Sequence, residues 1–332
     1  SYIFQEDIIM LEKGFAATTS TDAHGDKLSK KQLIQMANEI NEDKYARGAG
    51  LAHDLLAMPI GKTIHGEVIP IGANEYGLEI QQELFDKFKI IKSTDGKRYV
   101  KAESEIDKRP FIEEISYDNL KLAVSIDKVN FSDDNYHLFW EQFNDNDIEK
   151  KALIRKSFLP DPEIVFTLIK GTIYSLSALV AKKTFDKLSD SISEDIEKSY
   201  QVIKKAIGSF VKLANHNERP ITYVFEDNYN DILVQLIVRS NNADKVLMSI
   251  EKEKICIVSH KIDELKTQFP INKVQFLYSE ENEQWEFRYL TTATGAVIGT
   301  KIAFRYTKEL ISKQPFAQRL DIKLVPQNNN EQ

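Results

Sequence analysis

The first half of the chain combines stretches of two-residue apolar alternation with a helical apolar period. It predicts strands over residues 8–18, 63–71, 76–84 and 120–131, and a helix over residues 29–47. Ser29 and Gln32 fit a capping box at the start of that helix, and Gly48 is its predicted stop. A turn near residues 72–74 joins the second and third strands into a hairpin, and residues 92–109 form a charged excursion.

The second half mixes helices and strands. It predicts helices over residues 163–188, 194–215, 243–253 and 261–268, and strands over residues 221–226, 232–239, 274–279, 285–291 and 296–306. Pro160-Asp161-Pro162 is the clearest break, because proline interrupts helices and restricts the residue before it. We therefore expect an α+β fold with domains over residues 1–160 and 161–326, and a disordered polar tail over residues 327–332.

Composition removes several classes of function. The net charge of -7 disfavours general nucleic-acid binding, so we expect no nucleic-acid partner. The single cysteine, Cys256, excludes a disulfide within the chain and a cysteine zinc site, and its apolar neighbours predict a buried small residue. The sequence holds no Walker A, GxGxxG or HExxH motif. We therefore expect no cofactor and no metal.

One segment is long and apolar enough to be compared with a membrane span. Residues 164–181 are mostly apolar, but Lys170 lies near the middle and several residues are Ser or Thr. This composition favours a buried or amphipathic helix. The N-terminus has no basic region followed by an apolar stretch, so we expect neither a signal peptide nor a membrane partner.

Three short patches follow one another between about residue 11 and residue 85. The first reads Gly-Phe-Ala-Ala at 14–17 and Thr-Asp-Ala-His-Gly-Asp at 21–26, the second Leu-Ala-His-Asp at 51–54 and Pro-Ile-Gly-Lys at 59–62, and the third Tyr-Gly-Leu-Glu-Ile at 76–80. In this order and spacing they resemble the front half of the phage prohead (head-maturation) serine proteases. The resemblance does not extend beyond about residue 160.

The resemblance implies a fold, a function and partners. The fold would be a prohead-protease-like β-barrel with flanking helices, followed by a second α+β domain of unknown role. The function would be that of a serine endopeptidase of head maturation, which cleaves scaffold and capsid proteins and itself. Capsid, scaffold or portal proteins would be the partners, in a homo-oligomer. The location would be the cytoplasm of the infected host cell or the phage particle.

The resemblance also implies the residues of the site. His53 matches the general base, and Ser125 is the best match for the nucleophile. The acidic third position matches Arg155, which cannot stabilise a protonated histidine, so Asp54 or Asp127 would have to replace it. Asp127 also stands near the place of the family's glycine after the nucleophile. A rival hypothesis is therefore a catalytically inactive protein that keeps the fold and works by binding.

Each candidate also has a simpler structural interpretation. Ser125 fits a solvent-facing polar position on a half-buried strand. His53 fits a structural histidine at a strand end. His24, between two aspartates, fits either a metal cluster or, more simply, a polar turn. His65 is a competing base without an obvious partner.

Overall fold

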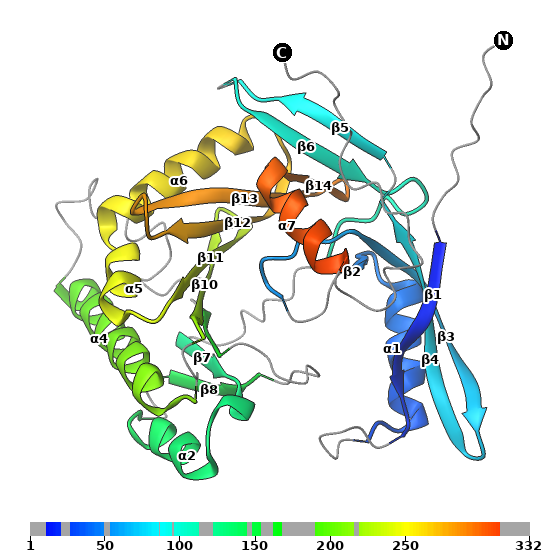
Figure 1. Cartoon of the computed structure of the whole chain (residues 1–332), viewed down its shortest axis with the longest axis horizontal. Coiled ribbons are helices and arrows are strands. Elements are labelled where there is room, and N and C mark those ends of the chain that lie inside the picture. The colour runs from blue at the N-terminus through cyan, green and yellow to red at the C-terminus, as the bar shows by residue number, and fades with distance from the viewer. Residues whose placement is uncertain are drawn as a thin grey trace. The chain divides into compact units, whose positions relative to one another are not determined.

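The chain folds into two compact units in a computed structural model (Figure 1). The structure describes residues 11–20, 27–49, 54–85, 87–94, 96–112, 122–144, 148–153, 162–167, 190–215 and 219–312. Unit 1 comprises Ser1–Ile112 and Tyr289–Gln332, and unit 2 comprises Glu113–Arg288. Unit 2 is therefore an insertion within the sequence of unit 1. This division differs from the boundary expected at Pro160, a residue outside the described ranges.

The first sheet of unit 1 is antiparallel. In spatial order its strands are β1 (Leu11–Thr18), β4 (Glu75–Leu84), β3 (Gly61–Gly72) and β2 (Arg47–Ala49). β3 and β4 form the predicted hairpin, and its turn places Asn74 at a φ of 62°, a left-handed conformation that asparagine tolerates. Two register shifts along this hairpin bring Lys62 opposite Glu83.

Helix α1 (Lys30–Glu42) packs on this sheet through Leu33, Ala37 and Ile40. The predicted capping box is confirmed, because the Gln32 N–H donates to Ser29 Oγ (3.3 Å) and the Ser29 N–H donates to Gln32 Oε1 (2.8 Å).

The predicted end of this helix is wrong. Helix α1 ends at Glu42, and Gly48 belongs to strand β2. Arg109 Nη1 donates to the carbonyls of Ile40 (3.1 Å) and Asp43 (2.9 Å), so a residue distant in sequence satisfies acceptors at the helix end.

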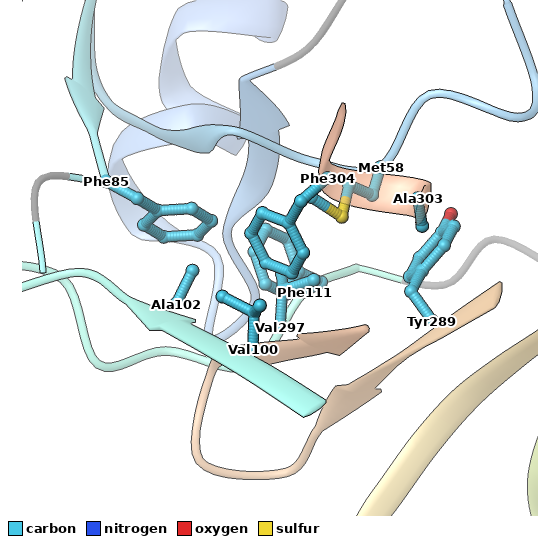
Figure 2. Close-up of a cluster of buried hydrophobic side chains, with 9 residues drawn as sticks. All are labelled: Met58, Phe85, Val100, Ala102, Phe111, Tyr289, Val297, Ala303 and Phe304. Atoms are coloured by element: carbon cyan, nitrogen blue, oxygen red, sulfur yellow. The ribbon is translucent and has the colours of Figure 1, made fainter. Parts of the chain in front are cut away.

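The second sheet of unit 1 is also antiparallel. Its order is β5 (Lys87–Lys92), β6 (Arg98–Glu103), β14 (Ala296–Gly299) and β13 (Gln284–Thr292), and β13 enters unit 1 at Tyr289. The expectation of a charged excursion over residues 92–109 is wrong in part, because this range includes strand β6 and the end of strand β5. Figure 2 shows the core on this sheet, where Phe304 lies among Val100, Ala102 and Val297. The same core also contains the side chains of Met58, Phe85 and Phe111.

The strand predicted over residues 296–306 is wrong in its second part. β14 ends at Gly299 and helix α7 (Lys301–Ser312) follows. Thr300 starts that helix, because its Oγ1 accepts from the Ala303 N–H (3.1 Å) and its carbonyl accepts from the Phe304 N–H (3.2 Å). The capping hydroxyl of Thr300 therefore favours a helix here, despite the β-branched and aromatic residues that would favour a strand.

Unit 2 contains a mixed sheet. From the unit 2 part of β13 the order is β12 (Ile271–Ser279), β11 (Ile232–Ser240), β10 (Ile221–Tyr229), β9 (Glu163–Thr167), β7 (Leu122–Ile126) and β8 (Ile148–Ala152). The pairs β9–β10, β11–β12 and β7–β8 are parallel, and β10–β11 and β7–β9 are antiparallel. Nearly every residue of these strands is at least half-buried.

The helix predicted over residues 163–188 is wrong at its start. Residues 163–167 form the buried strand β9, which pairs with β10 and β7, and residues 168–189 lie outside the described ranges. A continuous apolar run fits a buried strand and a buried helix equally well by periodicity. In the parts of the chain that the structure describes, no helix has the length and apolarity that a membrane crossing needs.

Helices cover one face of the unit 2 sheet. They are α4 (Asp190–Leu213), α5 (Ala243–Ser249) and α6 (Lys252–Lys266), seen side by side along the sheet in Figure 1. The Trp285 indole N–H donates to the Ser249 carbonyl (2.9 Å) and holds α5 to β13. The helices predicted over residues 243–253 and 261–268 are thus displaced: one break falls between Ser249 and Lys252, and the second helix is longer.

Helix α2 (Asp133–Glu141) packs against α4 through aromatic rings. Phe131 lies 5.2 Å from Phe210 and 5.9 Å from Phe139 between ring centroids. Both units thus mix helices and strands, which confirms the predicted α+β class.

Candidate functional site

Ser125 lies on β7, the next-to-last strand of the unit 2 sheet. It belongs to β7, all five residues of which are buried, and it is 6% exposed. Its register partners are Val165 on β9 and Lys151 on β8, so strands flank it on both sides. The expectation of a half-buried strand with a solvent-facing serine is therefore wrong.

The proposed base cannot be placed beside it. His53 and Arg155 lie outside the described residues, so the pairing of His53 with Ser125 stays a prediction. His24 and the aspartates around it are also outside the described ranges, and His65 is an exposed residue of β3.

The two carboxylates that could complete a triad both have other hydrogen-bond donors. Asp54 Oδ2 accepts from the Tyr306 hydroxyl (2.6 Å) and Oδ1 accepts from the Leu56 N–H (2.9 Å). Asp127 is 1% exposed, and its Oδ1 accepts from the Val129 N–H (2.9 Å) at the start of a short 3₁₀ helix, Lys128–Asn130. Both aspartates therefore hold local backbone turns.

The described residues contain no group of three or more His, Cys, Asp or Glu side chains arranged to hold a metal ion. Cys256 is buried in α6, which confirms the prediction of a buried small residue.

The most unusual ionisable group in the described chain is Lys62, which is fully buried at 0% exposure. Its Nζ donates to the carbonyls of Asp107 (2.6 Å) and Arg109 (2.5 Å) and lies 5.2 Å from the centroid of the Phe111 ring. Burial lowers the pKa of this ammonium from 10.5 to about 8, against the opposing effect of the Asp107 and Glu83 carboxylates.

Glu83, opposite Lys62 on the neighbouring strand, holds the same loop. Its carboxylate accepts from Ser104 Oγ and from three successive backbone N–H groups, those of Glu105, Ile106 (2.8 Å) and Asp107 (3.1 Å). The loop over residues 104–109 is therefore bound by its N–H groups to an acid and by its carbonyls to a base. Glu83 and Ser104 are each 1% exposed.

The network continues to helix α1 through two more charged residues. The Asp107 carboxylate accepts from Arg109 Nε (3.0 Å) and Nη2 (2.6 Å), and Arg109 caps α1 as described above. Burial alone would raise the pKa of Asp107, but the hydrogen bonds from Arg109 outweigh it and hold this pKa below its ordinary value.

Gly295, in the β13–β14 turn, packs directly against Lys62 and the Arg109 carbonyl. Gly295 has a φ of +75°, and a Cβ there would lie 2.3 Å from Lys62 Nζ and 2.4 Å from the Arg109 carbonyl. Strands β3 and β4, the loop after β6, helix α1 and the β13–β14 turn thus meet at Lys62.

This network holds unit 1 together but offers no reacting group. Lys62 and Ser104, the two residues with nucleophilic side chains, are enclosed, and Ser104 donates to Glu83 rather than to a base. The arrangement fastens the first sheet of unit 1 to the second. Perturbed ionisable groups mark structural ion networks as well as active sites, and the geometry here is of the first kind.

Sequence reasoning missed this network for a geometric reason. Extending the register from the predicted turn would place Lys62 opposite Phe85, whereas the two register shifts place it opposite Glu83. The available signal was a lysine directly after Gly61, at the start of a strand. Comparison of the whole chain with protein-family models, curated proteins and solved structures found no match.

Proposed function

We propose that this chain is a catalytically inactive structural or interaction protein, which acts by binding in the structure or assembly of a phage particle. The phage setting, the prohead-protease-like barrel and the capsid, scaffold or portal partners come from the sequence resemblance. The observation that carries the absence of catalysis is the burial of Ser125 within β7.

The proposed absence of catalysis is supported by how little a substrate could reach Ser125. A serine nucleophile must approach a peptide carbonyl while its proton passes to a base within about 3 Å. Ser125 is 6% exposed, and its strand is paired on both edges. This burial leaves a substrate carbonyl little access to Ser125, which supports the proposal.

The carboxylates support the same proposal. A triad aspartate must accept the second N–H of the histidine, so that the ring keeps the correct tautomer. Asp54 and Asp127 already accept backbone and hydroxyl hydrogens in local turns. These hydrogen bonds fix the orientation of both carboxylates within their local turns.

Unit 1 carries an exposed apolar surface suited to binding a protein. Phe15 is 54% exposed on β1, and Ile71 is 40% exposed on β3. Both side chains approach the position of Gly77, where a Cβ would lie 2.6 Å from the Phe15 ring and 3.2 Å from Ile71 Cγ2. An exposed aromatic and an aliphatic side chain in contact with one backbone position form a continuous patch, which is typical of interaction surfaces.

The experiment compares wild type, Ser125→Ala and His53→Ala after expression. Intact mass reports self-cleavage, a fluorophosphonate reports a reactive serine, and incubation with co-expressed scaffold and capsid proteins reports cleavage of partners. We expect three intact chains, no label and no fragments, together with co-purification of a capsid, scaffold or portal protein that Phe15→Asp weakens.

The alternative is the serine endopeptidase of head maturation, supported by the ordered resemblance through His53 and Ser125. Fragments or labelling in wild type that disappear in both Ser125→Ala and His53→Ala would establish it and overturn our proposal.

A further inference from the structure

Helix α7 of unit 1 has a basic outward face. It packs on the apolar core through Ala303 and Phe304, and its Lys301, Arg305 and Lys308 are exposed. These three cations follow one another at spacings of four and three residues, which places them along one side of the helix. In the part of the chain that the structure describes, none of the three forms an ion pair with a carboxylate.

An exposed apolar side chain accompanies these cations. Ile302 is 67% exposed, the highest value among the exposed large hydrophobic residues of the described ranges. The helix has one carboxylate, Glu309, against three cations. A surface that combines charge of one sign with an exposed aliphatic side chain is suited to a partner with the opposite charge and an apolar contact of its own.

Helix α2 of unit 2 has the opposite combination. It packs on α4 through Phe139, whose ring centroid lies 6.2 Å from that of Phe210, and its Asp134, Leu138 and Glu141 are exposed. The helix has three acidic residues and no lysine or arginine. Asp134 and Glu141 form no ion pair with a cation of the described residues. Leu138, which lies between them in sequence, is 48% exposed.

The two helix faces match in spacing as well as in charge. Lys301 and Lys308 are seven residues apart on α7, and Asp134 and Glu141 are seven residues apart on α2. Seven residues of α-helix rise about 10 Å, so two ion pairs can form at once when the helices lie side by side. Each face also adds one exposed aliphatic side chain, whose burial would favour association.

This match selects a second copy of the chain as the partner of α7. Two α7 faces would repel each other, and so would two α2 faces. The α2 face carries the charge, the spacing and the apolar side chain that the α7 face requires. Both faces are exposed and are therefore available to a partner.

We propose that copies of this chain associate head to tail, with the basic face of α7 on one copy against the acidic face of α2 on the next. Because the two faces differ, each copy has one neighbour at α7 and another at α2, which produces a ring or an open filament. Helices of 12 and 9 residues bury a small area, so one contact is weak and repeated contacts add up. The inference goes beyond the proposed function, because the partner is a second copy of the chain.

The test is sedimentation velocity of the full chain over a series of concentrations at physiological ionic strength. The Debye length there is about 8 Å, so the repulsion between copies of net charge -7 is largely screened, whereas groups in contact are screened less. The α7 variant is Lys301→Glu with Lys308→Glu. The α2 variant is Asp134→Lys with Glu141→Lys.

We expect wild type to self-associate and each variant to raise the Kd of self-association about tenfold or more, because two attractive pairs become repulsive. An equimolar mixture of the two variants should associate again, since the acidic α7 of one then meets the basic α2 of the other. This recovery would also show that both variants are folded. Lys31→Glu with Lys198→Glu, at exposed positions of α1 and α4, makes the same charge change as the α7 variant and should leave the Kd unchanged.

Several results would overturn the proposal. Wild type that stays monomeric, a Kd unchanged in either variant, or a mixture that does not associate would each do so. Self-association that Phe15→Asp weakens and the charge reversals do not would assign the contact to the apolar patch of β1 and β3 instead. A monomer that binds duplex DNA or polyglutamate through Lys301 and Lys308 would replace the second copy with another anionic partner. The proposed function fails on a separate observation, which is Ser125-dependent cleavage.

Discussion

The buried ammonium of Lys62 should make the stability of unit 1 depend on pH in the alkaline range. Its pKa is about 8 in the folded chain and 10.5 when free of the fold. Between these values the unfolded chain holds a proton that the folded chain has released, so the contribution of this group rises with pH. The contribution is complete above 10.5 and is lost as pH falls through about 8. The gap corresponds to about 3 kcal/mol at about 1.4 kcal/mol per pH unit.

The measurement is urea unfolding of wild type and Lys62→Met at several pH values from 7 to 10.5. Far-UV circular dichroism is the appropriate signal, because both tryptophans, Trp140 and Trp285, lie in unit 2. The titration of other groups cancels in the difference between wild type and variant. We expect this difference to shift by about 3 kcal/mol in favour of wild type as pH rises.

Lys13→Met is the control. Lys13 is an exposed lysine of β1 whose hydrogen bond with Glu79 raises its pKa, so its own contribution cannot grow between pH 8 and 10.5. A difference between wild type and Lys62→Met that stays constant over this range would refute the reasoning, because it would mean that Lys62 titrates as an exposed lysine does.

Further substitutions test the local structure. Gly295→Ala should destabilise the chain by about 2 kcal/mol or more, and Gly96→Ala by about 1 kcal/mol, both measured by urea unfolding. Both glycines have a positive φ, but only Gly295 lacks space for a Cβ. Equal losses of stability would contradict the contact with Lys62. Ser29→Ala should cost about 1 kcal/mol through the lost capping box, seen as a lower urea midpoint that Ser29→Asp restores. Phe139→Ala should cost about 3–5 kcal/mol and shift the Trp140 emission, since the two rings lie 4.9 Å apart; an unchanged spectrum would contradict the aromatic cluster.

The elements that sequence predicted well are those with a local signal. The start of α1 rests on Ser29 and Gln32, and the β3–β4 hairpin rests on two alternating segments and a turn at Asn74. Both are decided within a few residues, so periodicity and capping suffice. The α+β class follows from the same local signals.

The failures have long-range causes. The sequence of hairpin β5–β6 indicates a loop, because charged residues of both strands, among them Lys89, Lys101 and Glu103, raise the local polarity. The apolar sequence of β9 predicts a helix, but its neighbours β7 and β10 decide its conformation.

The Lys62 network depends on contacts that no local pattern encodes. Its partners lie at positions 83, 104–109 and 295, and their meeting depends on two register shifts in one hairpin. The site residues His53 and Ser125 came from resemblance alone, and their roles stay a prediction.

The insertion of unit 2 between the two parts of unit 1 sets an order for folding during synthesis. Met58, Phe85 and Phe111 leave the ribosome early, but Val297 and Phe304, which complete their core, are made only after the whole of unit 2. At roughly 5–20 residues per second this leaves the first part waiting for on the order of ten seconds or more. During that time its apolar side chains and unpaired strands are exposed to other nascent chains. Because unit 2 is made before the second part of unit 1, fast folding of unit 2 would bury its own apolar surface before the core of unit 1 is completed.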